Sequence, residues 1–108
     1  MESFYCPYLK ADVELTPERR QHIESKHPEL LPDHRDYLAQ TLTNPDEVRG
    51  DGRFPNTRIF TRWFGQLLRG KHLAVVVVTD KQTDDRHWIV TAYVTGTLRQ
   101  GETEWKRN

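Results

Sequence analysis

The chain has only one cysteine, Cys6, among 108 residues, so no disulfide can form within it. Its formal net charge is zero, which disfavours a protein that binds nucleic acid through overall charge alone. The longest apolar run, 73–78, has six residues, whereas a membrane-spanning helix needs roughly 20. The N-terminus has neither the basic stretch nor the apolar run of a signal peptide. We therefore expect a cytoplasmic protein with no membrane partner.

Several sequence motifs of enzymes are also missing. The chain has no glycine-rich phosphate loop and no Gly-x-Ser-x-Gly elbow, which disfavours kinases, nucleotide-dependent enzymes and serine hydrolases. It has no HxxxH, HxH or CxxC spacing, so a zinc site would have to be assembled by tertiary contacts alone. We expect no cofactor and no metal, and a metal-dependent hydrolase stays as an alternative that metal analysis would test.

The composition that is present favours one folded domain covering residues 1–108. Apolar residues make up 35% of the chain, charged residues 30%, and 11 residues are aromatic, which is not the composition of a disordered protein. The charge is unevenly distributed. Residues 1–51 carry a net charge of −5, whereas residues 52–79 hold five basic residues and no acid. The basic segment is either an anion-binding surface or a solvated face that complements the acidic half.

Two helices are predicted in the first half of the chain. Thr16 followed by Pro17 and Glu18 is a strong helix start, and Pro28 ends that helix near 26. A second helix is expected over about 32–42, where apolar residues recur at helical spacing.

Strands are predicted on both sides of these helices. Residues 1–12 are expected to form an N-terminal arm, and 13–15 a short edge strand. From residue 57 the period becomes two, with strands at 57–64, 71–79, 86–96 and about 104–106. The strand at 71–79 is apolar on both faces and is therefore expected at the centre of the sheet. Short polar loops between these strands favour an antiparallel meander.

His22 and His27 are the first candidate catalytic residues. Two imidazoles near one helix C-terminus can titrate near neutral pH and act as acid and base. In the alternative interpretation His22 packs in the core and His27 caps the helix.

Two further groups lie on the predicted strands. Thr91 and Tyr93 share one face of their strand, where a hydroxyl and a phenol can orient a phosphate, although both residue types are also simply good strand formers. Arg58, Arg62 and Lys71 accompany aromatic residues, a combination that suits phosphate binding and base stacking, or an ordinary exposed basic strand.

The order of several short motifs resembles a known superfamily. The motifs are Leu15-Thr16-Pro17-Glu18-Arg19, His22-Ile23, His27-Pro28-Glu29, Leu42-Thr43-Asn44-Pro45-Asp46-Glu47-Val48, Thr61-Arg62, Lys71-His72-Leu73 and Val90-Thr91-Ala92-Tyr93. In this order, over residues 13–106, they resemble the phage and cyanobacterial small domains of the barnase–EndoU–colicin–RelE-like (BECR) nuclease superfamily. The resemblance implies an α+β fold in which two N-terminal helices pack on a four-stranded antiparallel sheet.

The resemblance also implies a function. It implies a toxin-like, metal-independent endoribonuclease with its site on the open face of the sheet and the substrate 2′-hydroxyl as nucleophile. His22 and His27 would be the acid/base pair, Arg62 and Lys71 would hold the scissile phosphate, and Thr91 and Tyr93 would complete the site. The expected partners are RNA and a cognate antitoxin or immunity protein. The alternative is a non-catalytic binding module of the same fold that holds an anionic or protein partner.

Overall fold

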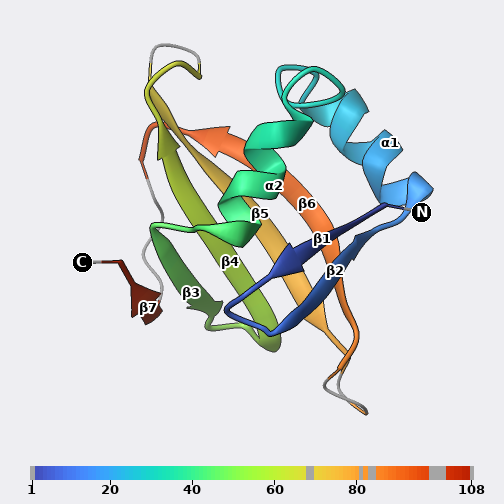
Figure 1. Cartoon of the computed structure of the whole chain (residues 1–108), viewed down its shortest axis with the longest axis vertical. Helices are drawn as coiled ribbons and strands as arrows, with labels where there is room; N and C mark the ends of the chain where they lie inside the picture. Colours follow the sequence, from blue (N-terminus) through green and yellow to red (C-terminus); the bar gives the residue numbers. More distant parts are fainter. Residues whose placement is uncertain (1, 68–69, 81, 83–84, 98–101, 108) are drawn as a thin grey trace.

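A computed structural model of the chain describes residues 2–67, 70–80, 82, 85–97 and 102–107. In these residues the chain forms two helices and seven strands, in the order β1 (Glu2–Cys6), β2 (Ala11–Leu15), α1 (Pro17–Lys26), α2 (Arg35–Thr43), β3 (Glu47–Asp51), β4 (Phe54–Phe64), β5 (Lys71–Thr79), β6 (His87–Thr95) and β7 (Glu102–Lys106). Both helices lie on one face of a single sheet (Figure 1). Within the described ranges, no helix has the length and apolar character that crossing a membrane requires.

The seven strands are ordered β1-β2-β6-β5-β4-β3-β7 across the sheet. Strands β3 to β6 form an antiparallel meander. Its last three strands were predicted as neighbours, but the strand predicted at about 104–106, β7, does not follow β6 in the sheet. The hairpin β1–β2 joins this meander through a parallel contact between β2 and β6, in which Val13 is opposite His87. At the other edge β7 pairs antiparallel with β3. The sheet is therefore mixed, with one parallel pair.

The predicted four-stranded antiparallel sheet with two N-terminal helices is wrong. Three further strands, β1, β2 and β7, enlarge the sheet to seven strands, and the β1–β2 hairpin precedes the helices. Residues 2–6 of the expected arm form β1, and the expected edge strand is the interior strand β2. Each of these two strands has only two buried apolar side chains, Phe4 and Cys6 in β1 and Val13 and Leu15 in β2. Such a short pattern does not show that the segment belongs to the sheet.

The local predictions for the helices and the central strand are confirmed. Thr16 caps α1, because its Oγ1 accepts a hydrogen bond of 3.2 Å from the Arg19 amide, and the helix ends at Lys26. The second helix starts at Arg35, slightly later than expected. Strand β5, predicted to be central, is the fourth of the seven strands.

A bulge in β6 changes which side chains face the helices. Val77 is opposite Ile89, but Val76 is opposite Thr91, so Val90 is an extra residue in this strand. The bulge places Ile89 on the same face as Ala92, although strict alternation predicted opposite faces. Thr91 accordingly faces away from the helices.

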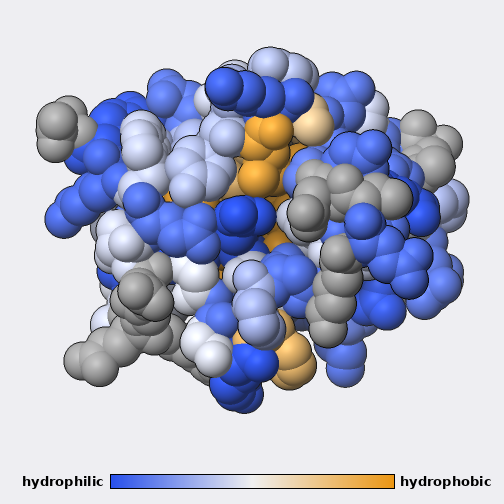
Figure 2. Space-filling view, turned by 90° about the horizontal axis from the view of Figure 1, so that it is seen from below, coloured by the Kyte–Doolittle hydropathy of each residue, from blue (hydrophilic) through white to orange (hydrophobic). Residues whose placement is uncertain are grey.

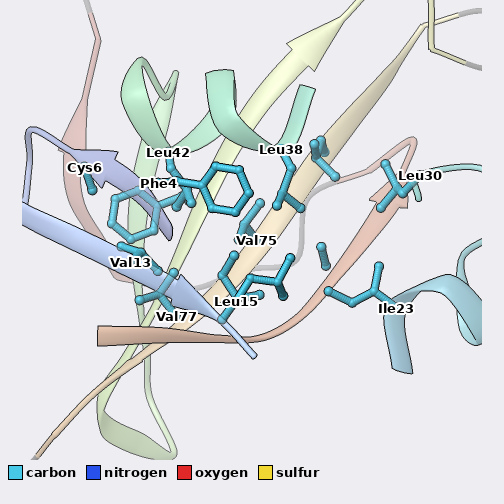
Figure 3. Packing of buried hydrophobic residues seen from close by; sticks show 14 of the residues in the cluster. Phe4, Cys6, Val13, Leu15, Ile23, Leu30, Leu38, Leu42, Val75 and Val77 are labelled. Atoms are coloured by element: carbon cyan, nitrogen blue, oxygen red, sulfur yellow. The ribbon is translucent and has the colours of Figure 1, made fainter. Parts of the chain in front are cut away.

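The hydrophobic core lies between the helices and the sheet (Figure 3). Ile23 from α1 and Leu38 and Leu42 from α2 are fully buried against strand residues such as Val75. Glu2 of β1 also connects the sheet edge to both helices, because its carboxylate forms ion pairs with Arg20 of α1 and with Arg35 of α2. No described element covers the opposite face, which we call the helix-free face.

Glu47 connects the edge strand β7 to β3. Its Oε1 accepts a hydrogen bond of 2.7 Å from Thr103 Oγ1 and lies 3.0 Å from Arg49 Nε. Burial alone would raise the pKa of this carboxyl, but the hydrogen bonds from Thr103 and Arg49 hold the pKa below its ordinary value. The carboxylate form therefore stabilises the fold.

We expect Glu47→Gln to lower the free energy of unfolding by about 1.5–3 kcal/mol at neutral pH, the usual range for a hydrogen bond to a charged group. Because the folded pKa is depressed, this stabilisation is present above the ordinary carboxyl pKa of 4.5 and is lost as the pH falls through the folded pKa. Urea titrations at neutral and acidic pH measure the difference, with Asp12→Asn on the exposed side of β2 as control. An equal difference at both pH values would contradict this role.

Candidate functional site

The structure divides the predicted site residues between the two faces of the sheet. Arg62 is opposite Leu73 in the β4–β5 pairing, and Leu73 belongs to the core on the helix side. Thr91 is opposite Val76, one residue out of phase with core residue Val75, so it lies on the helix-free face. The same alternation places Arg58 and Lys71 on the helix side and Tyr93 on the helix-free face.

The expected convergence of all these residues in one cleft is therefore not found. His22 and His27 belong to α1 and its C-cap, on the helix side, whereas Thr91 and Tyr93 lie beyond the sheet. The reason is physical: neighbouring positions of a strand point to opposite faces, and the backbone of the sheet separates the two sets.

The two histidines occupy local positions at the end of α1. His22 is half-buried beside the fully buried Ile23. The His27 amide donates a hydrogen bond of 2.7 Å to the Ile23 carbonyl, which makes His27 the C-cap. Its Nδ1 lies 3.3 Å from Glu29 Oε1. This is the capping arrangement that the alternative interpretation of the sequence described.

Arg62 is engaged by the end of α2. Its Nη1 donates a hydrogen bond of 2.6 Å to the Asn44 carbonyl, and its guanidinium lies 5.5 Å from the centre of the Phe64 ring. Lys71 is opposite Phe64 at the start of β5. Both cations thus lie at the end of the sheet where α2 packs on β4 and β5.

Arg58 lies elsewhere, in a hollow at the other end of the sheet. This hollow, which we call the β-end hollow, has a volume of about 800 Å³ and is lined by Tyr8, Leu9, Pro55, Asn56, Arg58, Thr79 and His87. The residues come from the turn between β1 and β2 and from the adjoining ends of β4, β5 and β6. Figure 2, which looks at this end of the molecule, shows apolar atoms in the middle of the face with polar side chains around them.

A chain of hydrogen bonds links the polar residues of the β-end hollow to Glu104 of β7. Tyr8 Oη donates to Glu104 Oε1 at 3.0 Å, and Arg58 Nε donates to the same oxygen at 3.0 Å. Arg58 Nη1 also donates to Thr79 Oγ1 at 3.4 Å. Thr79 Oγ1 lies 2.8 Å from His87 Nδ1. One continuous network thus contains a phenol, a carboxylate, a guanidinium, a hydroxyl and an imidazole.

Sheet register explains why these groups meet. Thr79 and His87 are opposite each other where β5 and β6 join the polar loop between them. Arg58 is opposite Val77, two residues before Thr79, so its side chain projects from the same face. Asn56 closes this end by donating from Nδ2 to the Thr79 carbonyl at 2.9 Å. The three strands therefore fix the relative positions of the cation, the hydroxyl and the imidazole.

The surroundings of Tyr8 keep its hydroxyl protonated. Burial and the neighbouring Glu104 carboxylate raise the pKa of Tyr8, which therefore remains a neutral hydrogen-bond donor. Arg58 and Glu104 form an ion pair whose side chains are each about one-third exposed, 31% and 32%. The pair is thus accessible to an anionic ligand. His87 is only 4% exposed, and Thr79 orients its ring.

Sequence reasoning selected Arg58 from this set and missed the other members. Thr79 and His87 are predictable in principle. They lie at the facing ends of the strands predicted at 71–79 and 86–96, on the same side of the sheet as Arg58. Glu104 and Tyr8 are separated by 96 residues, and only the positions of β7 and of the β1–β2 turn bring them together. No local signal marks that contact.

The donor types of the site are those of acid–base and anion-binding chemistry. Among the residues that the structure describes, no cluster of three or more His, Cys, Asp or Glu side chains is arranged to hold a metal ion. Comparisons of the chain with protein-family models, with curated proteins and with solved structures give no match.

Proposed function

We propose that this chain is a metal-independent endoribonuclease that reacts at the β-end hollow. The proposal rests on one observation: Arg58, in an open hollow, donates hydrogen bonds to the Glu104 carboxylate and to the Thr79 hydroxyl, which in turn contacts the His87 imidazole. Cleavage of RNA through its own 2′-hydroxyl needs a base, a group that stabilises the phosphate, and an acid. The Glu104, Arg58 and His87 side chains supply these three functions.

Each residue has a defined part in this reaction. Glu104 removes the proton of the 2′-hydroxyl, whose oxygen then attacks the adjacent phosphorus. Arg58 binds the phosphate and stabilises the added negative charge. His87, oriented by Thr79, gives a proton to the departing 5′-oxygen. The bond from phosphorus to the 5′-oxygen breaks, and the products are a 2′,3′-cyclic phosphate and a free 5′-hydroxyl. Tyr8 holds the Glu104 carboxylate in place.

The BECR resemblance supports this proposal, since it implies the same reaction, although it implied a different set of residues. The cytoplasm is the compartment that we propose. Cys6 is a free, buried thiol, and burial raises its pKa, so it stays protonated and resists oxidation. A cognate antitoxin or immunity protein is the expected partner of a cytoplasmic ribonuclease that would damage its own cell.

The proposal is tested by incubating the purified protein with a labelled single-stranded RNA in the presence of EDTA. We expect cleavage of the RNA, no cleavage of the matched DNA that lacks the 2′-hydroxyl, and no dependence on added metal. Cleavage of both strands, or cleavage that EDTA abolishes, would contradict the proposal.

One observation favours a second function, a non-catalytic binding module of the same fold. On the helix-free face, Ile59, Val76 and Val78 are partly exposed at neighbouring positions of β4 and β5. Such a face suits contact with another macromolecule. Under this alternative the wild-type protein would not cleave RNA, and Arg58→Gln would leave its binding to the partner unchanged.

A further inference from the structure

A second hollow adjoins the β-end hollow and shares Tyr8 with it. Its volume is about 290 Å³, and it is lined by Pro7, Tyr8, Thr43, Asn44, Pro45 and Trp105. The lining comes from the β1–β2 turn, from the end of α2 and from β7. Because Tyr8 contributes to both hollows, a ligand bound by Arg58 could extend into the second hollow without leaving the protein surface.

Two aromatic rings give this second hollow its character. The centres of the Tyr8 and Trp105 rings are 6.4 Å apart, with an angle of 57° between the planes. The Tyr8 ring is held from two sides. Its centre lies 6.0 Å from that of the buried Phe60 ring, with the planes at 81°, and its hydroxyl donates to Glu104. Trp105 is 38% exposed. One fixed ring and one accessible ring thus border the space.

The polar rim of the hollow is also fixed. Arg107 Nη2 donates to the Asn44 carbonyl and to Asn44 Oδ1, both at 2.6 Å, and to the Pro45 carbonyl at 3.1 Å. The Arg107 amide donates to the Asp46 carbonyl at 2.8 Å. Because Oδ1 of Asn44 accepts from Arg107, the donor protons of this side chain are those on Nδ2, which suit an acceptor on a ligand.

We infer that this second hollow binds an unpaired nucleobase of the RNA strand whose phosphate is held by Arg58, an inference that rests on the proposed function. Exposed aromatic rings stack on bases of any sequence, and each stacked base contributes about 1–3 kcal/mol to binding. Asn44 offers an amide to the edge of the base. The substrate is then a single strand, or a loop, in which a base beside the cleaved bond is free to leave its own stack.

The test measures binding without cleavage. The probe is a short, fluorescently labelled RNA oligonucleotide in which fluorine replaces every 2′-hydroxyl, so that the nucleophile is missing. Fluorescence anisotropy gives the Kd. We expect Trp105→Leu to weaken binding roughly 5- to 150-fold, the equivalent of about 1–3 kcal/mol. Trp105→Phe, which keeps a ring, should recover most of the loss. Trp63→Leu is the matched control, because Trp63 is 48% exposed on the helix-free face, and its Kd should stay within about twofold.

A second probe separates stacking from a structural effect of the substitution. In a series of such oligonucleotides, each lacks the base at one position. We expect that at one position the missing base weakens binding to the wild type but does not weaken binding to Trp105→Leu. Equal losses for both proteins at every position would overturn the inference, as would displacement of the oligonucleotide by a proline-rich peptide that binds the hollow more tightly.

The outcomes for the inference and for the proposed function remain distinguishable. If RNA is cleaved but neither Trp105→Leu nor the abasic series changes binding, the inference is wrong and the proposed function stands. If the oligonucleotide binds with the expected dependence on Trp105 while RNA is never cleaved, the base site stands and the proposed reaction is wrong.

Discussion

Arg58→Gln is expected to lower the rate of RNA cleavage by about two to three orders of magnitude, the usual loss when one donor to the developing charge is removed. Arg58 is the group that links the base and the acid, since it donates to both Glu104 and Thr79. Glutamine keeps part of the side-chain volume and removes the charge. Single-turnover cleavage of a labelled oligonucleotide measures the effect.

Arg62→Gln is the matched control on the same strand. Arg62 does not line either hollow, and the Asn44 carbonyl to which it donates is also held by Arg107, so we expect its substitution to change the cleavage rate by no more than about threefold. The double variant His22→Ala, His27→Ala tests the site that the sequence predicted. If the double variant were inactive and Arg58→Gln fully active, the reaction would take place at the end of α1.

Phe60→Ala is expected to cost about 3–5 kcal/mol of unfolding free energy, the range for deleting a buried aromatic side chain. Phe60 is fully buried in the middle of β4 and contacts the Tyr8 ring edge to face. Its loss leaves a cavity beneath the β1–β2 turn, and Tyr8 loses the ring that holds it. Urea denaturation followed by circular dichroism measures the change.

Phe54→Ala makes the same chemical change at the start of the same strand. Phe54 is 54% exposed, so its loss leaves no cavity, and we expect a change within about 0.5 kcal/mol. Similar losses for the two variants would contradict the position of Phe60 in the core.

The parts of the fold that the sequence predicted are those in which several local signals agree. At α1, the Thr16 cap and the proline after His27 define both ends, and the observed helix matches them. At β5, a continuous run of apolar residues favours a strand with a neighbour on each edge, and β5 is central in the sheet. These signals act over a few residues and need no knowledge of distant partners.

The errors have a common physical origin in contacts between distant segments. Strand β1 is stabilised by pairing with β2 and by the ion pairs of Glu2 with two helices, none of which is visible in a five-residue pattern. The bulge at Val90 shifts the phase of β6 by one residue without any glycine or proline to announce it. Strict alternation could not have placed Ile89 with Ala92 on one face.

The candidate site was only partly predictable for the same reason. Arg58 was selected because arginine on an alternating strand is a local feature. The carboxylate that accepts its hydrogen bond lies 46 residues later in β7, and the Tyr8 hydroxyl comes from the first turn of the chain. Conversely, Thr91 and Tyr93 share a face with each other but not with the cations, because every cation in question lies on the helix side.

The chemical ends of the cleaved RNA test the central claim most directly. After cleavage by the wild-type protein in EDTA, mass spectrometry of the fragments should find 2′,3′-cyclic phosphates and 5′-hydroxyls, because the attacking oxygen belongs to the substrate. Fragments that carry 5′-phosphates and 3′-hydroxyls would show that water is the nucleophile, and would contradict a reaction carried out by Glu104, Arg58 and His87 as described.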